Sequence, residues 1–146
     1  MKIEFIQDPQ QLQPKITVTA SQLTEEVREL LLRLEHGHPT AIPGWQGDQA
    51  VLLAPEDILR FFTQGKSVYV QTASDQYTVR QRLYELEEQL DAHRFVRISH
   101  SEIVNLSHVT GLDLSINGTI RMTLTGGVVC FVSRRSLKKI KQALNL

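Results

Sequence analysis

Polar side chains suited to binding chemistry are concentrated in residues 95–106. Set among apolar residues, this stretch carries Arg97, Ser99, His100, Ser101 and Asn105. The arginine supplies a cation, and the other side chains supply hydrogen-bond donors and acceptors. Such a mixture is typical either of a sheet with one solvated face or of a recognition loop between two strands. Both alternatives predict that the stretch brings polar groups to a surface.

A second group of polar residues, mostly basic, lies in residues 132–141 and has hydroxyl groups at its start. It includes Ser133, Arg134, Arg135 and Lys138. The whole chain has equal numbers of acidic and basic residues, but residues 61–146 hold eleven basic and seven acidic side chains, and none of the acidic ones follows Asp113. A basic C-terminal surface attracts a polyanion, whereas the alternative is a solvated helix face. We interpret the two stretches as parts of one nucleic-acid-binding surface.

The same residues do not form a catalytic constellation. His100, Ser101 and Glu102 supply a base, a hydroxyl and an acid, but neighbours in an extended strand point to opposite faces. Cys130 lies in an apolar run and is expected to be a small buried residue rather than a nucleophile. The five histidines have no cysteines or acidic cluster at ligand spacing. We therefore expect no enzyme activity, no metal site, no cofactor and no small-molecule substrate.

The first 39 residues are expected to form a strand–helix extension. Residues 2–6 and 15–19 contain β-branched or aromatic residues, which predict two strands, or one strand and an extended arm. Thr24 is a potential cap for a helix that Gly37 ends. The extension is too short to be a doubly wound receiver domain. It could pack against the main domain or make a dimer contact.

Residues 40–146 are expected to form a mainly β domain of the α+β class. A helix is predicted over residues 79–93, because apolar side chains there recur at a spacing of three and four and so share one face. These side chains are Val79, Leu83, Leu86 and Leu90. Because the intervening carboxylates fall mostly on other faces, we expect this helix to pack on the sheets rather than to lie along DNA.

The last part of the domain is predicted to contain three antiparallel strands and a helix. Asn117 and Gly118 lie between two alternating runs, the first of which extends to Ile116, and such a pair predicts a β-hairpin. The third strand should end at Val132, with the terminal helix beginning directly after it and Ser133 as its candidate cap.

Two motifs at consistent spacing resemble the LytTR family of DNA-binding domains. The family pattern Phe-x-Arg-x-x-x-Ser-x-x-Val-Asn is matched here by Phe95, Arg97, Ser101, Val104 and Asn105. A Ser-Arg pair that opens a basic terminal helix is matched by Ser133 and Arg134. The resemblance runs from about residue 40 to the C-terminus. It implies an elongated stack of antiparallel β-sheets with one helix packed alongside and another at the C-terminus.

The resemblance also implies a transcriptional regulator that reads the major groove of double-stranded DNA with loops and with the start of the last helix. The three contact points known in the family fall on Lys66–Ser67, on His100, and on Arg134–Arg135. Arginine can contact guanine with two hydrogen bonds, so we expect both arginines to read bases, with His100 as a second base contact. Phosphate contacts are expected from Ser99, Ser101, Ser133 and Lys138.

Several of these residues have structural alternatives. Arg97 is as readily an ion-pair partner of Glu102 or Asp91 as it is a phosphate contact. Asn105 is expected to satisfy the backbone of a turn. For the protein as a whole, the alternative is a protein-interaction module whose basic C-terminal face docks an acidic partner.

The resemblance implies partners as well. Family members commonly bind repeated promoter half-sites in pairs, which implies a homodimer on DNA, and small stand-alone members are often paired with a membrane-protein inhibitor. The N-terminus lacks the uninterrupted apolar core of a signal peptide, and no stretch approaches the roughly twenty apolar residues of a membrane span. A single cysteine is consistent with a reducing compartment. We therefore expect a cytoplasmic protein.

Overall fold

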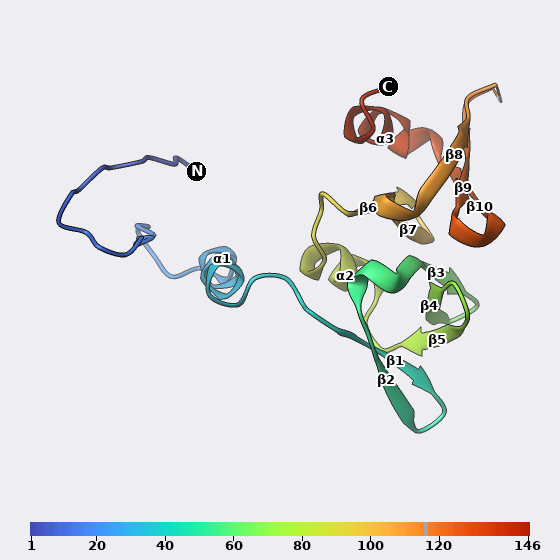
Figure 1. The fold of residues 1–146 in the computed structure, drawn as a ribbon, viewed down its shortest axis with the longest axis horizontal. Helices are drawn as coiled ribbons and strands as arrows, with labels where there is room; N and C mark the ends of the chain where they lie inside the picture. The colour runs from blue at the N-terminus through green and yellow to red at the C-terminus, as the bar shows by residue number, and fades with distance from the viewer. Residues whose placement is uncertain (116) are drawn as a thin grey trace. The chain divides into compact units, whose positions relative to one another are not determined.

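The computed structural model describes residues 1–115 and 117–146 (Figure 1). The chain divides into two units, residues 1–37 and residues 38–146. Ile116, which was expected to end a strand, lies outside the described residues. No helix in the described part of the chain is long and apolar enough to cross a bilayer.

The first unit contains one helix, α1 (Glu25–His36), which begins and ends as predicted. The Thr24 hydroxyl accepts a hydrogen bond from the Val27 backbone N–H at 3.2 Å. Gly37 adopts a φ of 69° and donates its backbone N–H to Arg33 O. Glycine is favoured at such a helix end because it has no Cβ to clash in the left-handed region.

The two strands predicted for residues 2–6 and 15–19 are not formed. Residues 1–24, all of them described, contain no strand, and the side chains of Ile3, Phe5 and Ile16 are exposed. A strand needs a hydrogen-bonded neighbour, and β propensity reflects packing as much as backbone preference. The prediction was wrong because the residues have the right types but no sheet to join.

The second unit is built on two antiparallel sheets. A seven-stranded sheet has the order β2-β1-β5-β4-β3-β7-β6, and a three-stranded sheet has the order β10-β9-β8. The strands of the larger sheet are β1 (Ile42–Gln46), β2 (Gln49–Leu53), β3 (Ile58–Gln64), β4 (Ser67–Thr72), β5 (Gln76–Val79), β6 (Phe95–Ser99) and β7 (Glu102–Asn105). The smaller sheet contains β8 (Val109–Asp113), β9 (Ile120–Leu124) and β10 (Val128–Val132). The predicted α+β class and the three consecutive antiparallel strands are confirmed.

Two helices complete this unit, α2 (Leu83–Gln89) and α3 (Leu137–Ala143). Helix α2 is shorter than the predicted range of 79–93, because Val79 pairs with Val68 in the sheet and ends β5. The four apolar side chains that predicted the helix are nevertheless all buried. Single 3-10 turns occupy η1 (Pro55–Asp57), η2 (Leu106–His108), η3 (Thr125–Gly127) and η4 (Arg134–Ser136).

Strands β6 and β7 lie between two hydrophobic cores, which explains why residues 95–106 are so apolar. Phe95 and Ile103 face the first core, where the larger sheet packs against α2. Val96, Ile98 and Val104 face the second core, which the smaller sheet and α3 cover. Figure 1 shows these two strands between the smaller sheet and α2. Because both faces of β6 and β7 are largely buried, three of their four polar residues, Ser99, Glu102 and Asn105, lie at strand ends, and only Arg97 lies in the middle of a strand.

Candidate nucleic-acid interface

The turn between β6 and β7 presents His100 to solvent, and Arg97 holds the backbone of that turn. The Arg97 guanidinium donates to Ser99 O at 2.8 Å and to His100 O at 2.5 Å. Its third contact is an ion pair with Glu87 Oε2 at 3.0 Å. The predicted ion-pair partners, Glu102 and Asp91, are therefore wrong. Since all three contacts are internal, Arg97 acts on this turn as a positioning residue.

The two serines of the turn are joined to each other. The Ser101 backbone N–H donates to Ser99 Oγ at 3.2 Å, and the two hydroxyl oxygens lie 3.3 Å apart. Both side chains are half-buried, whereas His100 between them is exposed. A hydroxyl has one donor and two acceptor positions, so each serine retains capacity for a further hydrogen bond.

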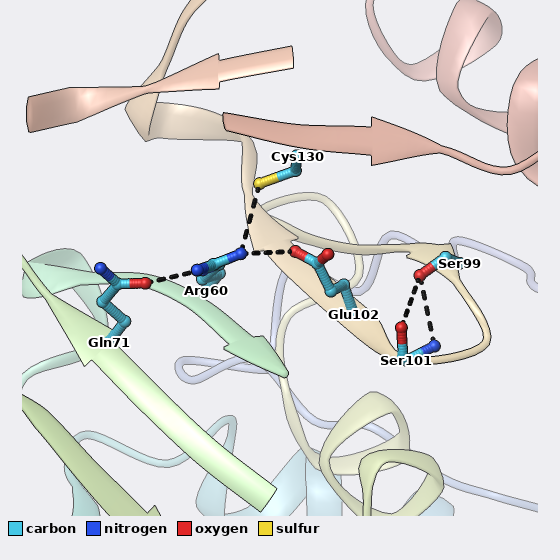
Figure 2. A network of polar contacts seen from close by, with 6 residues as sticks. All are labelled: Arg60, Gln71, Ser99, Ser101, Glu102 and Cys130. Atoms are coloured by element: carbon cyan, nitrogen blue, oxygen red, sulfur yellow. Dashed lines mark hydrogen bonds and ion pairs between the residues drawn. The ribbon is translucent and has the colours of Figure 1, made fainter. Parts of the chain in front are cut away.

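A network of polar contacts beneath this turn connects the two sheets, and sequence reasoning missed it (Figure 2). Arg60 on β3 forms an ion pair with Glu102 on β7 at 3.0 Å, and both side chains are less than one-fifth exposed. Arg60 also donates to Gln71 Oε1 at 2.7 Å and lies 4.0 Å from Cys130 Sγ on β10. A cation inside the apolar run of β3 was the available sequence signal. The network holds Glu102, the first residue of β7, in place directly after the β6–β7 turn.

Cys130 is buried, as predicted, and its thiol is not a nucleophile. Burial, together with the nearby Glu102 carboxylate, which disfavours a thiolate, raises the pKa of Cys130 to about 12. The thiol is therefore protonated at neutral pH, and only a thiolate is strongly nucleophilic. Within residues 1–115 and 117–146, no three metal-binding side chains gather closely enough to hold an ion.

The start of the C-terminal segment lies beside the β6–β7 turn. The Ser133 backbone N–H donates to Ile98 O at 2.8 Å, so the 3-10 turn η4 begins next to the end of β6. Arg134 and Arg135 follow immediately, and both are exposed. The Ser133 hydroxyl contacts Ser136 Oγ at 3.2 Å rather than a backbone N–H, so the predicted side-chain cap is absent.

Helix α3 begins only at Leu137, later than predicted, because the η4 turn comes first. Ile140 is completely buried in the second core, which fixes the helix to the domain. Lys138, Lys139 and Lys141 are exposed. The helix therefore presents cations to solvent while its apolar side chains anchor it.

Gly118, between β8 and β9, lies close to the Arg134 side chain, an arrangement that sequence reasoning did not reveal. Gly118 has a φ of 76°, and a Cβ at this position would lie 3.0 Å from Arg134 Nε. The Thr119 hydroxyl donates to Val132 O, which joins the loop to the end of β10. Strands β8 and β9 form the predicted hairpin, although β8 ends at Asp113, earlier than predicted. Gly118, which has no Cβ, leaves room for the arginine side chain.

The Lys66–Ser67 turn lies at the same end of the larger sheet as the β6–β7 turn. Strand β3 pairs with β7, and the Thr63 backbone N–H donates to Ser101 O at 2.9 Å. The chain then turns through Gly65, whose φ is 61°, before β4 begins. Lys66 and Ser67 are exposed. We give the name basic edge to the exposed cationic and imidazole side chains of the Lys66–Ser67 turn, the β6–β7 turn and the start of the C-terminal segment; they are Lys66, His100, Arg134, Arg135 and Lys138.

An Arg97→Gln substitution tests the positioning role of this residue. We expect it to lower the free energy of unfolding by about 1–2 kcal/mol, because two carbonyl groups and one carboxylate lose a charged donor. Urea denaturation of the full chain measures the change. Arg94→Gln is the matched control, since Arg94 is more exposed and its ion pair with Glu56 is longer, at 3.7 Å. Equal losses in the two variants would contradict the assignment.

Comparison with known proteins shows what class of molecule carries this edge. The family model described as the LytTr DNA-binding domain matches residues 48–145. Two relatives from Staphylococcus aureus strains MSSA476 and MW2, each named as an uncharacterized HTH-type transcriptional regulator, are 32% identical over 100% of this chain and 99% of their own length. A LytTr DNA-binding domain of a putative methyl-accepting/DNA response regulator from Bacillus cereus has the same fold. It superimposes with a TM-score of 0.71 at 19% identity and covers 74% of this chain and 99% of its own.

These matches place the chain among the DNA-binding transcriptional regulators and indicate a non-enzymatic regulator. It belongs to the LytTR family of DNA-binding domains, as its two motifs indicated. The relatives are named as HTH-type, that is, helix-turn-helix, regulators. In the described residues of this chain, however, the basic helix α3 follows strand β10 and the 3-10 turn η4, and no helix directly precedes it.

Proposed function

We propose that this protein reads a specific sequence in the major groove of double-stranded DNA with the basic edge. The observation that carries the proposal is the hydrogen bond from Ser133 N–H to Ile98 O at 2.8 Å. It brings the segment that begins Arg134–Arg135 beside the turn that presents His100. A contiguous set of exposed cations and hydrogen-bond donors suits both base edges and phosphates.

Within the proposed interface, the side chains have different tasks. Arg135 and Arg134 read bases, and Arg134 lies close to Gly118. His100 supplies a second base contact. Phosphate contacts come from Lys66, Ser67, Ser99, Ser101, Ser133 and Lys138. Arg97 supports this surface from below by holding the backbone of the β6–β7 turn.

Titration with duplex DNA at two salt concentrations tests the proposal. Phosphate contacts release counterions, so affinity should fall steeply as salt rises, while the preference for one sequence over random duplexes remains. The alternative function, docking of an acidic protein partner by the basic C-terminal face, predicts no preference among duplex sequences. A salt-sensitive interaction without sequence preference would therefore favour the alternative.

A Lys138→Ala substitution should weaken binding to all duplexes alike. Lys138 is exposed on α3 and, as a point charge, attracts phosphate without reading bases. We expect the slope of log affinity against log salt to decrease in magnitude by about 1. Lys15→Ala, in the other unit, serves as the control and should leave the slope unchanged. A change of sequence preference in Lys138→Ala would contradict the phosphate role.

The proposal extends to partners and location. Two copies bind repeated promoter half-sites as a homodimer on DNA, in the cytoplasm, and a membrane-protein inhibitor regulates the free protein. Support for these statements comes from the family resemblance and, for location, from the need to reach DNA. Co-purification from cells tests the inhibitor, and recovery of no membrane protein would remove it from the proposal.

A further inference from the structure

Helix α1 carries an apolar stripe that nothing in its own unit buries. Val27, Leu30, Leu31 and Leu34 share one face at 100° per residue. None of them is buried, and Leu31 and Leu34 are 41% and 48% exposed. An isolated helix of twelve residues is only marginally stable in water. The helix therefore gains stability when a partner covers this stripe.

The stripe is complementary to itself when two copies run antiparallel. With a two-fold axis at the middle of α1, between Leu30 and Leu31, Val27 of one copy faces Leu34 of the other. The same axis places Leu30 against Leu31. Every apolar residue of the stripe then meets an apolar residue, with no side chain left over. We propose that α1 pairs antiparallel with α1 of a second copy of this chain.

The charged residues on either side of the stripe also favour a second copy of this chain as the partner of α1. One flank carries Glu26 and Arg33, and the opposite flank carries Arg28 and Glu35. A two-fold axis perpendicular to the helices places each flank against its own copy, so each flank can form two acid–base pairs across the interface. Within one helix, Arg28 lies 3.9 Å from Glu25, and Glu35 lies 3.9 Å from His36. These contacts are exposed and long, so they compete only weakly with acid–base pairs between the two copies.

The antiparallel direction follows from the helix ends. Glu25 and Glu26 lie in the first turn, whereas Arg33 and His36 lie in the last. Parallel copies would place two acidic ends together and align two helix dipoles. Antiparallel copies place each acidic N-terminus beside a basic C-terminus, which is favourable for both charge and dipole.

The size of the helix sets the strength of the pairing. A stable protein interface buries at least about 1,000 Å², and two helices of this length cover less. Pairing is therefore weak in free solution. It becomes effective when one duplex holds two copies close together, because the second contact is then intramolecular. This last step rests on the proposed DNA-binding function, whereas the pairing itself does not.

The position of α1 relative to the family domain agrees with a separate role. The family model begins at residue 48, after α1, whereas the relatives from Staphylococcus aureus align over the whole of this chain. Helix α1 thus lies outside the DNA-binding module but inside the length shared with these regulators. This position agrees with a role for α1 in pairing rather than in DNA reading.

Sedimentation equilibrium of the full chain over a wide concentration range, without DNA, tests the pairing. Leu34→Asp should raise the dimer dissociation constant at least about tenfold, because each dimer loses two buried leucines. Leu32→Asp is the matched control, since Leu32 lies on the opposite face and is 51% exposed. A parent chain that stays monomeric at every concentration, or equal effects of the two substitutions, would overturn the proposal.

Disulfide trapping tests the direction of the pairing. A mixture of Val27→Cys and Leu34→Cys chains should cross-link faster than either variant alone, because these positions face each other only in antiparallel helices. The native Cys130 is buried and does not compete. Faster cross-linking of each variant with itself would overturn the antiparallel arrangement.

A binding site can be obtained by selecting duplexes that the parent chain binds from a random DNA pool. Binding to duplexes with one and with two copies of this selected site separates the inference from the proposed function. Leu34→Asp should bind the single site like the parent but lose at least about tenfold in affinity for the double site. If the parent binds neither duplex, the proposed function fails while the sedimentation result stands. If the affinity of Leu34→Asp for the double site exceeds its affinity for the single site by as much as in the parent, the role of α1 on DNA is overturned.

Discussion

Replacing Arg135 with alanine is expected to cost about 1–3 kcal/mol of DNA-binding free energy and to relax the preference for one base pair. The reason is geometric. Arg135 is exposed in the first turn after the hydrogen bond that joins Ser133 to Ile98, beside the turn that carries His100. A guanidinium there can donate two parallel hydrogen bonds to one guanine. Titration against the selected duplex and against single-base variants of it measures both effects.

The Arg135→Lys variant separates charge from geometry. Lysine keeps the positive charge but lacks the planar fork, so we expect it to retain much of the salt-dependent affinity and to lose discrimination at the same base pair. If both variants bind the selected duplex and random duplexes like the parent, Arg135 does not read a base.

Replacing Asn105 with alanine is expected to lower the free energy of unfolding by about 2–4 kcal/mol. Asn105 is the completely buried polar residue of the core, at 0% exposure. Its amide donates to Ile58 O at 2.9 Å and to Pro55 O at 3.3 Å, and its oxygen accepts from Ser107 N–H at 3.0 Å. Alanine leaves these three groups without that partner, and the Ile58 carbonyl among them belongs to a buried residue. Urea denaturation of the full chain measures the loss.

Asn105→Asp provides a sharper comparison. Aspartate still accepts from Ser107 N–H but cannot donate to the two carbonyl groups, and its charge is buried beside them. We expect this variant to be destabilised at least as much as Asn105→Ala. Losses below about 0.5 kcal/mol in both variants, the range of ordinary surface substitutions, would show that the hydrogen bonds do not hold the β7 end in place.

The sequence was most informative where local pattern and tertiary packing agree. Asn105 was expected to satisfy a backbone turn, and it does so with hydrogen bonds to three backbone groups. The Asn117–Gly118 pair predicted a hairpin because its turn chemistry is local. Helix α1 was predicted from its cap at Thr24 and its end at Gly37, both of which act within a few residues.

The remaining features depend on contacts between distant segments, which spacing does not encode. Arg97 pairs with Glu87 rather than with Glu102, because Arg60 from β3 occupies Glu102. No periodicity indicates that Gly118 leaves room for Arg134. Residues 2–6 have strand-forming types, yet the sheet that would accept them is absent from their unit. Of the candidate site, the sequence indicated the residues, and the structure showed that the start of the segment carrying Arg134 and Arg135 lies beside the end of β6.

Selection of bound duplexes from a random DNA pool, performed in parallel with the parent chain and with Arg135→Ala, tests the central claim most directly. The account predicts that the parent enriches a defined sequence and that the variant enriches the same sequence with one base pair relaxed. Enrichment of no sequence by the parent, or an identical sequence with identical stringency from both proteins, would contradict it.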